Sequence, residues 1–256
     1  MSDYYDCDRL EQERDLILPL FQDNKRLHER AARYISAAGA LIHDNYRLAM
    51  ECTDTEKAMR FAVLLARREL PDKASGTGQE QLGFLSGVTP LGMVFYESTL
   101  HKLCKRTVII SDEYGTTSRI ILAVVRACAL ELGHDIITAH CPFSPAEKID
   151  HILIPALSLC FTTANSYHAI AGEERRIHAR RFMSAPALRA KKQRLSFNRR
   201  AARELIVGAC EILGEAKLVH DRLEKHYIGA MDFEAVNPVL EQLLAEISAR
   251  AEELKT

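Results

Sequence analysis

A short polar loop, residues 111–118, holds the side chains in this chain that are best suited to phosphate chemistry. It follows an apolar run over residues 107–110 and leads into a helical pattern over residues 118–132. Free backbone N–H groups converge at the start of a helix and favour an anion there. A hydroxyl such as that of Ser118 is an oxygen ligand that Mg²⁺ accepts. The candidate nucleotide-binding residues are therefore Ser111, Asp112, Glu113, Tyr114, Gly115, Thr116, Thr117, Ser118 and Arg119.

A second apolar strand is predicted at residues 135–139, directly after this helix. Strand, loop, helix and strand in this order form the core unit of a P-loop nucleotide-binding domain. His140 and Cys141 follow the second strand, and ligands of such domains lie at this carboxyl edge of the sheet. We expect both residues at the edge of the site. Since no third ligand lies nearby in the sequence, zinc is disfavoured there.

The remaining strand signals indicate an α/β fold with a mostly parallel sheet, parallel in its centre. Residues 84–88 and 93–96 read as short strands around a Pro-Gly turn, and residues 157–163 as a third core strand. A short helix is expected at residues 97–104, and another is started by Ser144 and Pro145. Five short strands alternating with helices are typical of this class.

Long helical patterns flank the predicted core on both sides. Residues 1–72 form a helical segment that Pro71 ends, and residues 73–82 form a linker before the core at 83–170. Residues 171–256 are predicted to be helical, with a helix-rich, basic stretch at 173–203 followed by two helices at 205–227 and 233–254. The last two suggest an antiparallel helical hairpin. The expected architecture is thus a core flanked by long helical hairpins.

Composition points to a cytoplasmic protein that is not drawn to a membrane. Among 256 residues 47% are hydrophobic and 27% charged, and the formal net charge is -1, so no overall charge attracts nucleic acid or lipid. No apolar run reaches the roughly 18–20 residues that span a bilayer, and the acidic N-terminus argues against a signal peptide. The odd number of cysteines, 7, is typical of reduced thiols.

Several segments together resemble an uncharacterised family of bacterial P-loop ATPases built from two tandem copies of one module. They are residues 84–92, 107–118, 140–145, 149–155 and 220–233. The resemblance implies that residues 1–72 correspond to the helical tail of a first module without its nucleotide-binding core. Residues 80–256 then correspond to a complete second module.

The loop departs from the Walker A pattern of that family, G-x-x-G-x-G-K-S/T. Its three glycine positions hold Ser111, Tyr114 and Thr116, its lysine position holds Thr117, and only the hydroxyl of Ser118 remains. The Asp of Walker B type is matched by Thr162, which the resemblance places at the site edge.

These replacements predict that ATP and Mg²⁺ bind weakly or not at all, with little or no hydrolysis. The lost lysine removes a charge-assisted bond worth about 1.5–3 kcal/mol, and the lost Asp removes support for Mg²⁺. Asp112 and Glu113 instead put carboxylates where the phosphate charge would lie, next to the positive end of the helix dipole. If nucleotide binding survives, Arg175, Arg180 or Arg181 is the candidate to supply the missing charge.

Three functional hypotheses follow. The first is a P-loop ATPase-related protein with an eroded nucleotide site and a binding or assembly role, in which the helical arms offer surfaces to a protein partner or a second copy. The second is an active ATPase or small-molecule kinase that uses other residues. The third is a nucleic-acid-associated protein acting through a basic helix at 175–203, although a solvated helical face is the favoured interpretation of that segment.

Overall fold

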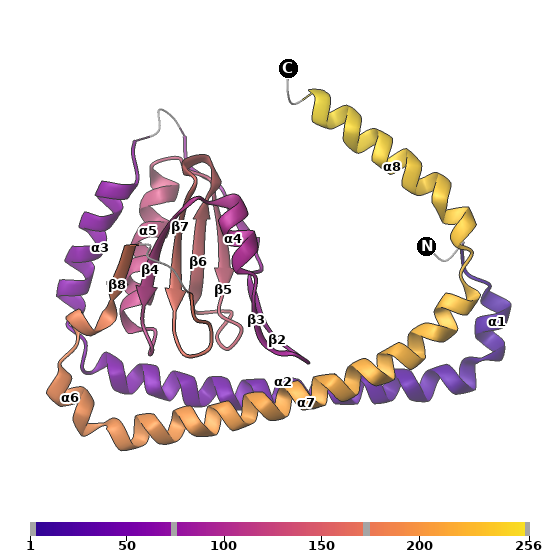
Figure 1. Cartoon of the computed structure of the whole chain (residues 1–256), viewed down its shortest axis with the longest axis horizontal. Coiled ribbons are helices and arrows are strands. Elements are labelled where there is room, and N and C mark those ends of the chain that lie inside the picture. Colours follow the sequence, from indigo (N-terminus) through magenta and orange to yellow (C-terminus); the bar gives the residue numbers. More distant parts are fainter. Residues whose placement is uncertain (1–3, 73–75, 171–174, 254–256) are drawn as a thin grey trace. The chain divides into compact units, whose positions relative to one another are not determined.

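The structure, a computed structural model, describes residues 4–72, 76–170 and 175–253 (Figure 1). Its Cα positions divide into two compact units. One is the contiguous segment Ala31–Glu211, and the other combines the described parts of Met1–Arg30 and Ile212–Thr256. Each unit is described by itself.

A mostly parallel six-stranded sheet forms the centre of the first unit. In chain order its strands are β1 (Glu80–Gly83), β4 (Arg106–Ser111), β5 (Ile136–His140), β6 (Ile149–Ile154), β7 (Leu159–Ala164) and β8 (Arg175–His178). In space their order is β1-β5-β6-β7-β4-β8, and only β6 runs antiparallel to its neighbours. The predicted α/β class and mostly parallel sheet are confirmed. The prediction of a parallel centre is wrong, because β6 lies in the interior of the sheet.

The predicted strand–loop–helix–strand unit is present. It consists of β4, the loop, α5 (Thr116–Glu131) and β5, and the third predicted core strand corresponds to β7. β7 lies directly beside β4, with Ile110 paired to Thr163, whereas β6 and β7 separate β4 from β5. The carboxyl ends of β4 and β7 therefore lie side by side next to the loop.

Two predicted strands form a small sheet of their own. β2 (Ser86–Thr89) and β3 (Gly92–Phe95) pair antiparallel around a turn in which Gly92 has φ 104°. The two strands pair with each other, and neither joins the main sheet. The prediction of a single sheet is therefore wrong. The helix α4 (Glu97–Leu103) follows, as predicted.

The edge strand β1 lies in the segment predicted to be a linker; residues 73–75 of that segment lie outside the described residues. Its hydrogen-bonding partners come from the folded chain, since the Glu80 carboxylate accepts from Arg126 at 2.9 Å and from Thr138 at 2.8 Å. A local sequence pattern carries no sign of these contacts. The short helix predicted from Ser144 and Pro145 is also wrong, because the chain makes turns there before β6 begins.

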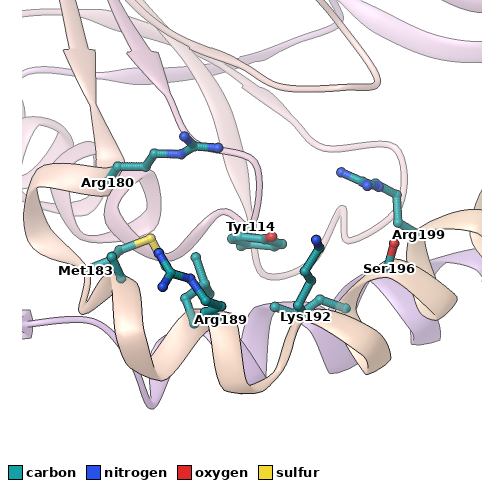
Figure 2. Close-up of a pocket in the computed structure, with 10 residues that line it drawn as sticks. Tyr114, Arg180, Met183, Arg189, Lys192, Ser196 and Arg199 are labelled. Atoms are coloured by element: carbon teal, nitrogen blue, oxygen red, sulfur yellow. The ribbon is translucent and has the colours of Figure 1, made fainter.

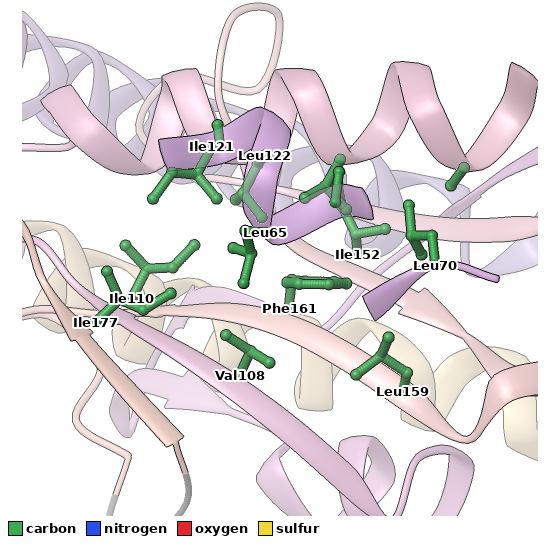
Figure 3. Close-up of a cluster of buried hydrophobic side chains, with 14 of the residues drawn as sticks. Leu65, Leu70, Val108, Ile110, Ile121, Leu122, Ile152, Leu159, Phe161 and Ile177 are labelled. Atoms are coloured by element: carbon green, nitrogen blue, oxygen red, sulfur yellow. The ribbon is translucent and has the colours of Figure 1, made fainter. Parts of the chain in front are cut away.

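One hydrophobic core lies between the sheet and two helices, α3 (Thr55–Glu69) and α5 (Figure 3). Figure 3 shows Leu65 from α3 and Ile121 from α5 directed toward Val108, Ile152 and Phe161 of the sheet. Full burial of side chains of this size contributes about 1.5–3 kcal/mol each. This layer holds the start of α5 against the carboxyl ends of β4 and β7.

The basic stretch predicted to be one helical region is divided. Residues 171–174 lie outside the described residues, and the chain then forms β8, a 3-10 turn η3 (Ala179–Phe182), α6 (Ala185–Ala190) and the start of α7 (Lys192–Ala230). β8 forms because Ile177 is buried beside Ile110, while Arg176 donates to Ser111 Oγ at 2.9 Å and to the Ile170 carbonyl at 2.8 Å. The continuous basic helix at 175–203 is therefore a wrong prediction.

In the first unit the second half of α2 (Arg14–Met50) runs antiparallel to the first half of α7. Arg194 donates to Asp44 at 2.7 Å, and the buried amide of Asn45 donates to the Leu195 carbonyl at 3.1 Å. The long N-terminal helix thus pairs with the long C-terminal one. This pairing replaces the separate hairpin expected at each end.

The second unit has the same kind of pairing. Asn24 at the start of α2 donates to the Ala216 carbonyl at 3.0 Å, and Glu13 lies 2.6 Å from His226. The short helix α1 (Cys7–Gln12) precedes α2, and α8 (Phe233–Glu253) follows α7. α8 has no buried residue, whereas an antiparallel hairpin with α7 would bury its apolar face.

Candidate functional site

The carboxylate of Asp112 occupies the start of α5. Its Oδ1 accepts from the backbone N–H groups of Tyr114 at 3.2 Å and Gly115 at 3.0 Å, and its Oδ2 accepts from Ser118 N–H at 2.8 Å. Asp112 is 2% exposed. These are N–H groups of the type that bind phosphate at a helix N-terminus. The prediction that this carboxylate lies at the start of the helix is confirmed.

Glu113 does not share that role. Its side chain is exposed, accepts from Ser166 N–H at 3.1 Å and lies 3.9 Å from the Arg199 guanidinium. The prediction that both carboxylates lie at the helix start is wrong for Glu113, because consecutive side chains of the loop point in different directions.

Gly115 is the N-cap of α5 and has φ 74°, a left-handed conformation that glycine adopts without strain. The helix then buries Thr116, Thr117 and Ser118. Their hydroxyls have no hydrogen-bond partner among the residues that the structure describes. The Ser118 hydroxyl, which the resemblance assigns to Mg²⁺, is therefore buried and unpaired.

A lysine that the sequence reasoning missed reaches this loop from the start of β6. Lys148 is buried, and its Nζ lies 2.7 Å from Asp150 Oδ1. A Cβ placed on Gly115 would lie 3.1 Å from Lys148 Cε. Burial by itself lowers the pKa of Lys148, but the neighbouring Asp150 carboxylate outweighs this and raises it. Lys148 is therefore a buried ammonium beside the loop.

The same ion pair continues into a polar network at the end of β7. Thr163 Oγ1 donates to Asp150 at 2.9 Å, and His168 Nε2 lies 2.7 Å from the Thr163 carbonyl. Burial acts to raise the pKa of Asp150, but the Lys148 ammonium holds it below its usual range. Burial lowers the pKa of His168, so its imidazole is neutral.

Thr162, the residue matched to the Walker B Asp, touches this network, among the described residues, only through His151, whose ring centroid lies 5.4 Å from that of His168. Neighbouring side chains of a strand point to opposite faces of the sheet, and Thr162 Oγ1 lies 2.7 Å from His151 Nδ1 on the other face. His151 stacks on Phe95 with ring centroids 5.1 Å apart, and burial lowers its pKa to about 3. The structure does not bring Thr162 to the loop.

His140 and Cys141 occupy the edge of this region but do not form a metal site. His140 Nδ1 lies 2.5 Å from the Pro145 carbonyl, and burial raises the pKa of the Cys141 thiol to about 11. No cluster of His, Cys, Asp and Glu suited to a metal ion is found in the described part of the chain. The cavity that Cys141, Lys148 and Gly115 line has a volume of only about 30 Å³. That leaves room for about two or three water molecules.

Arg119 points away from the loop N–H groups. Its Nη1 donates to the Glu147 carbonyl at 2.9 Å, and its guanidinium lies 4.4 Å from the centroid of the Tyr46 ring. Ser111, at the other end of the loop, accepts from Arg176. The structure thus places the loop residues together; Ser111, Asp112, Glu113 and Arg119 bond to the protein itself, whereas the hydroxyls of Thr116, Thr117 and Ser118 stay unpaired within the described residues.

A larger cavity of about 380 Å³ lies between the loop and the segment that contains α6 and the start of α7 (Figure 2). Of the three arginines predicted to supply a charge, only Arg180 lines it. Arg175 pairs with Glu69, and Arg181 lies 4.9 Å from the centroid of the Phe61 ring.

Comparisons with protein families, curated proteins and solved structures find no match to this chain. No described helix is long and apolar enough to cross a membrane. All seven cysteines lie in the described residues, and each is a free thiol.

Sequence reasoning missed Lys148, Asp150 and His168. It singled out the basic stretch that contains Arg189, Lys192 and Arg199, but it did not predict that they line one cavity with Arg180. A signal for the first pair was present in the sequence. Lys148 and Asp150 flank the start of an apolar strand, and charged residues in such a run are costly to bury unless they are paired. Nothing in the sequence showed that the cavity cations lie together, because η3, α6 and α7 bring them to one cavity only in the folded chain.

Proposed function

We propose that this chain is related to P-loop ATPases and has a binding or assembly role in place of ATP hydrolysis. The observation that carries the proposal is the set of hydrogen bonds from Tyr114, Gly115 and Ser118 to the Asp112 carboxylate. A phosphate at the loop would have to displace this buried carboxylate or lie beside a like charge. ATP and Mg²⁺ would then be bound weakly or not at all there.

The two replaced ATPase residues support the same proposal. Thr117 is buried in the first turn of α5, and Thr162 is bonded to His151. Neither side chain carries a charge that offsets a phosphate or holds Mg²⁺. We place such a protein in the cytoplasm, in keeping with its reduced thiols.

The assembly part of the proposal is supported by α8. Leu240, Leu243, Leu244 and Ile247 are exposed at helical spacing along it. Apolar rows of this kind mark interaction surfaces. We assign this surface to α8 of a second copy, because an isologous contact needs only one self-complementary face. Light scattering after gel filtration is expected to show a dimer that Leu243→Glu dissociates, while Val207→Glu, the same change at an exposed residue of α7, leaves it intact. A monomer at every concentration would rule out the assigned contact.

A second candidate function rests on Lys148 and the unpaired Ser118 hydroxyl. In an ATPase or small-molecule kinase, Lys148 would supply the charge that Thr117 lacks, and Ser118 would bind Mg²⁺. This requires Lys148 to leave Asp150 and Asp112 to leave the loop N–H groups. The nucleic-acid alternative has no such support, because the continuous basic helix it needed is not formed.

The experiment compares the wild type with Asp112→Gly. The wild type is expected to show no Mg²⁺-dependent ATP turnover, and tripolyphosphate is expected to leave hydrogen exchange of the Gly115 and Ser118 amides unchanged. Asp112→Gly frees the N–H groups that the carboxylate holds, so tripolyphosphate is expected to slow exchange of the same amides. Glu113→Gln is the matched control, since it removes an equal charge from the same loop without freeing those N–H groups.

Turnover of ATP by the wild type would contradict the proposal. If that turnover required Mg²⁺ and was abolished by Ser118→Ala and by Lys148→Met, the enzyme would replace the binding protein as the assigned function. Unchanged amide exchange in Asp112→Gly would show that the loop has lost its affinity for phosphate for another reason.

A further inference from the structure

The larger cavity has the size and position of a ligand site. Its volume of about 380 Å³ lies within the range of about 300–1,000 Å³ for small-molecule pockets. An adjoining cavity of about 280 Å³ shares Tyr114 and Arg180 with it and reaches Ser111 and His178 at the carboxyl ends of β4 and β8. Ligands of parallel α/β sheets bind at this edge. The cavity belongs entirely to the unit Ala31–Glu211.

The cations that line this cavity outnumber the carboxylates that pair with them. Figure 2 shows Arg180, Arg189, Lys192 and Arg199 arranged around the ring of Tyr114. Arg180, Arg189 and Lys192 form no ion pair with a carboxylate of the described residues, and Arg199 lies 3.9 Å from Glu113, the outer limit of a contact. Cations on a concave wall raise the local concentration of anions.

Two basic residues that lie next to the cavity-lining ones in sequence, Lys191 and Arg194, are neutralised by carboxylates. Lys191 lies 2.6 Å from Glu51, and Arg194 lies 2.7 Å from Asp44. Lys191 and Lys192 are neighbours in sequence, yet only the one that faces the cavity lacks a carboxylate. The cavity wall thus keeps cations that no carboxylate of the described residues neutralises.

The rest of the wall is apolar and aromatic. Met183, Leu188 and Leu195 line the cavity together with the half-buried ring of Tyr114. Burial and the Glu113 carboxylate raise the pKa of Tyr114, so its phenol is neutral and is able to donate a hydrogen bond to a ligand. A flat ring can stack on Tyr114, and such aromatic pairs contribute about 0.5–1.5 kcal/mol.

We infer that this cavity binds a small organic polyphosphate, with its phosphate groups on Arg189, Lys192 and Arg180 and a planar ring against Tyr114. The inference goes beyond the proposed function, because these side chains differ from the loop N–H groups that Asp112 holds. Guanidinium and ammonium groups match phosphate oxygens, and the apolar wall accepts the uncharged part of the ligand.

The test is calorimetric titration of the full chain with ADP, pyrophosphate and adenosine, in EDTA. ADP is expected to bind more tightly than pyrophosphate, and adenosine is expected not to bind at millimolar concentration. Arg189→Ala and Lys192→Ala are each expected to weaken ADP and pyrophosphate about tenfold, the effect of one lost charge-assisted bond. Both side chains are exposed, so neither change disturbs the core. Tyr114→Leu is expected to weaken ADP about fivefold and leave pyrophosphate unchanged.

Arg200→Ala is the matched control, because it removes the same charge from an exposed residue of α7 that does not line the cavity. It is expected to leave the ADP affinity unchanged. Failure of ADP to bind would overturn the inference, as would equal affinities in the wild type, Arg189→Ala and Lys192→Ala. An equal loss in Arg200→Ala would also overturn it, since binding would then follow overall charge. Loss of binding in Ser118→Ala alone would place the anion at the loop and overturn both this inference and the proposed function.

Discussion

A carboxylate in the first turn of a helix gains from the partial positive charge of the free N–H groups there. Asp112 combines this gain with burial and with hydrogen bonds to Tyr114, Gly115 and Ser118. The residue thus stabilises the loop in the absence of a ligand. A loop that binds phosphate instead depends on its ligand for the same contacts.

Asp112→Ala is expected to lower the free energy of unfolding by about 2 kcal/mol, the upper end of the range for losing a helix N-cap. The size follows from the several N–H groups that lose their acceptor together. Urea denaturation followed by circular dichroism measures it. Glu113→Gln is expected to change stability by less than about 0.5 kcal/mol, because its contacts are at the surface. Equal effects of the two changes would contradict the assigned role of Asp112.

Breaking the buried ion pair of Lys148 and Asp150 is expected to lower the free energy of unfolding more than Asp112→Ala does. Lys148→Met leaves the Asp150 carboxylate buried without its counter-charge, which costs about 3–5 kcal/mol. The double variant Lys148→Met, Asp150→Asn is expected to recover part of this loss. Lys217→Met removes a lysine from an exposed ion pair with Asp221 and is expected to cost less than about 1 kcal/mol. Urea denaturation of the variants tests this order.

The same pair predicts how stability depends on pH. Because Lys148 holds the pKa of Asp150 below its usual range against the effect of burial, the carboxylate stabilises the fold above its ordinary pKa of about 4. This contribution is lost as the pH falls from there through the lowered pKa. The free energy of unfolding, measured from pH 3 to 7, is expected to fall less steeply toward acid pH in Asp150→Asn than in the wild type. Lys148→Met removes the main group that lowers the pKa of Asp150 against the effect of burial, so the acid limb is expected to be less steep in this variant too. An acid limb that is unchanged in both variants would contradict the assigned coupling.

At this scale, a local pattern predicted the contact of Asp112 but not those of Lys148. Asp112 bonds to residues at most six positions away, so the loop alone determines the contact. Lys148 approaches Gly115 from a strand that follows the helix and two further turns. Because β6 runs antiparallel to its neighbours, its first residues, and Lys148 just before them, lie next to the loop.

Among the elements, α3, β4 and β8 are joined through one buried carboxylate. Glu69 at the end of α3 is 8% exposed and lies 3.0 Å from Arg68 and 3.1 Å from Arg106 at the start of β4. It also pairs with Arg175 at the start of β8. This carboxylate therefore fixes the edge strand that leads to Arg180 and the cavity.

Glu69→Gln is expected to lower the free energy of unfolding by about 1–3 kcal/mol, since it removes the charge from a buried acceptor. Faster hydrogen exchange at residues 175–178 is expected to accompany the loss. Glu56→Gln, which breaks an exposed pair with Arg60 on the same helix, is expected to change neither quantity. A stability loss without faster exchange in β8 would show that Glu69 acts on α3 and β4 only.

The elements that the sequence predicted well are those in which apolar residues recur at a regular spacing along the chain. α3 begins after Asp54, which accepts from Lys57 N–H at 2.9 Å, and it ends just before Pro71, as predicted. β8 has one buried residue, Ile177, among arginines, so its strand character comes from pairing with β4. The partner of each long helix is equally non-local, because α2 and α7 are separated by the whole sheet in the chain.

For the whole molecule, the division into two units separates the candidate sites from the α8 surface. Asp112, Lys148 and the cations of the larger cavity all lie in the contiguous segment Ala31–Glu211. The exposed apolar row of α8 lies in the other unit. Ligand binding and self-association are therefore expected to be separable by truncation.

A fragment of residues 31–211 is expected to fold cooperatively and to bind ADP within about twofold of the full chain. The reason is that the core between the sheet, α3 and α5 is complete within it, as are the contacts of Asp44 and Asn45 to the first half of α7. The fragment is also expected to be monomeric where the full chain dimerises, because it lacks α8. Thermal unfolding, calorimetry and light scattering measure the three properties. A fragment that unfolds without a cooperative transition would show that the second unit is needed to stabilise the first. Dimerisation of the fragment would move the contact away from α8.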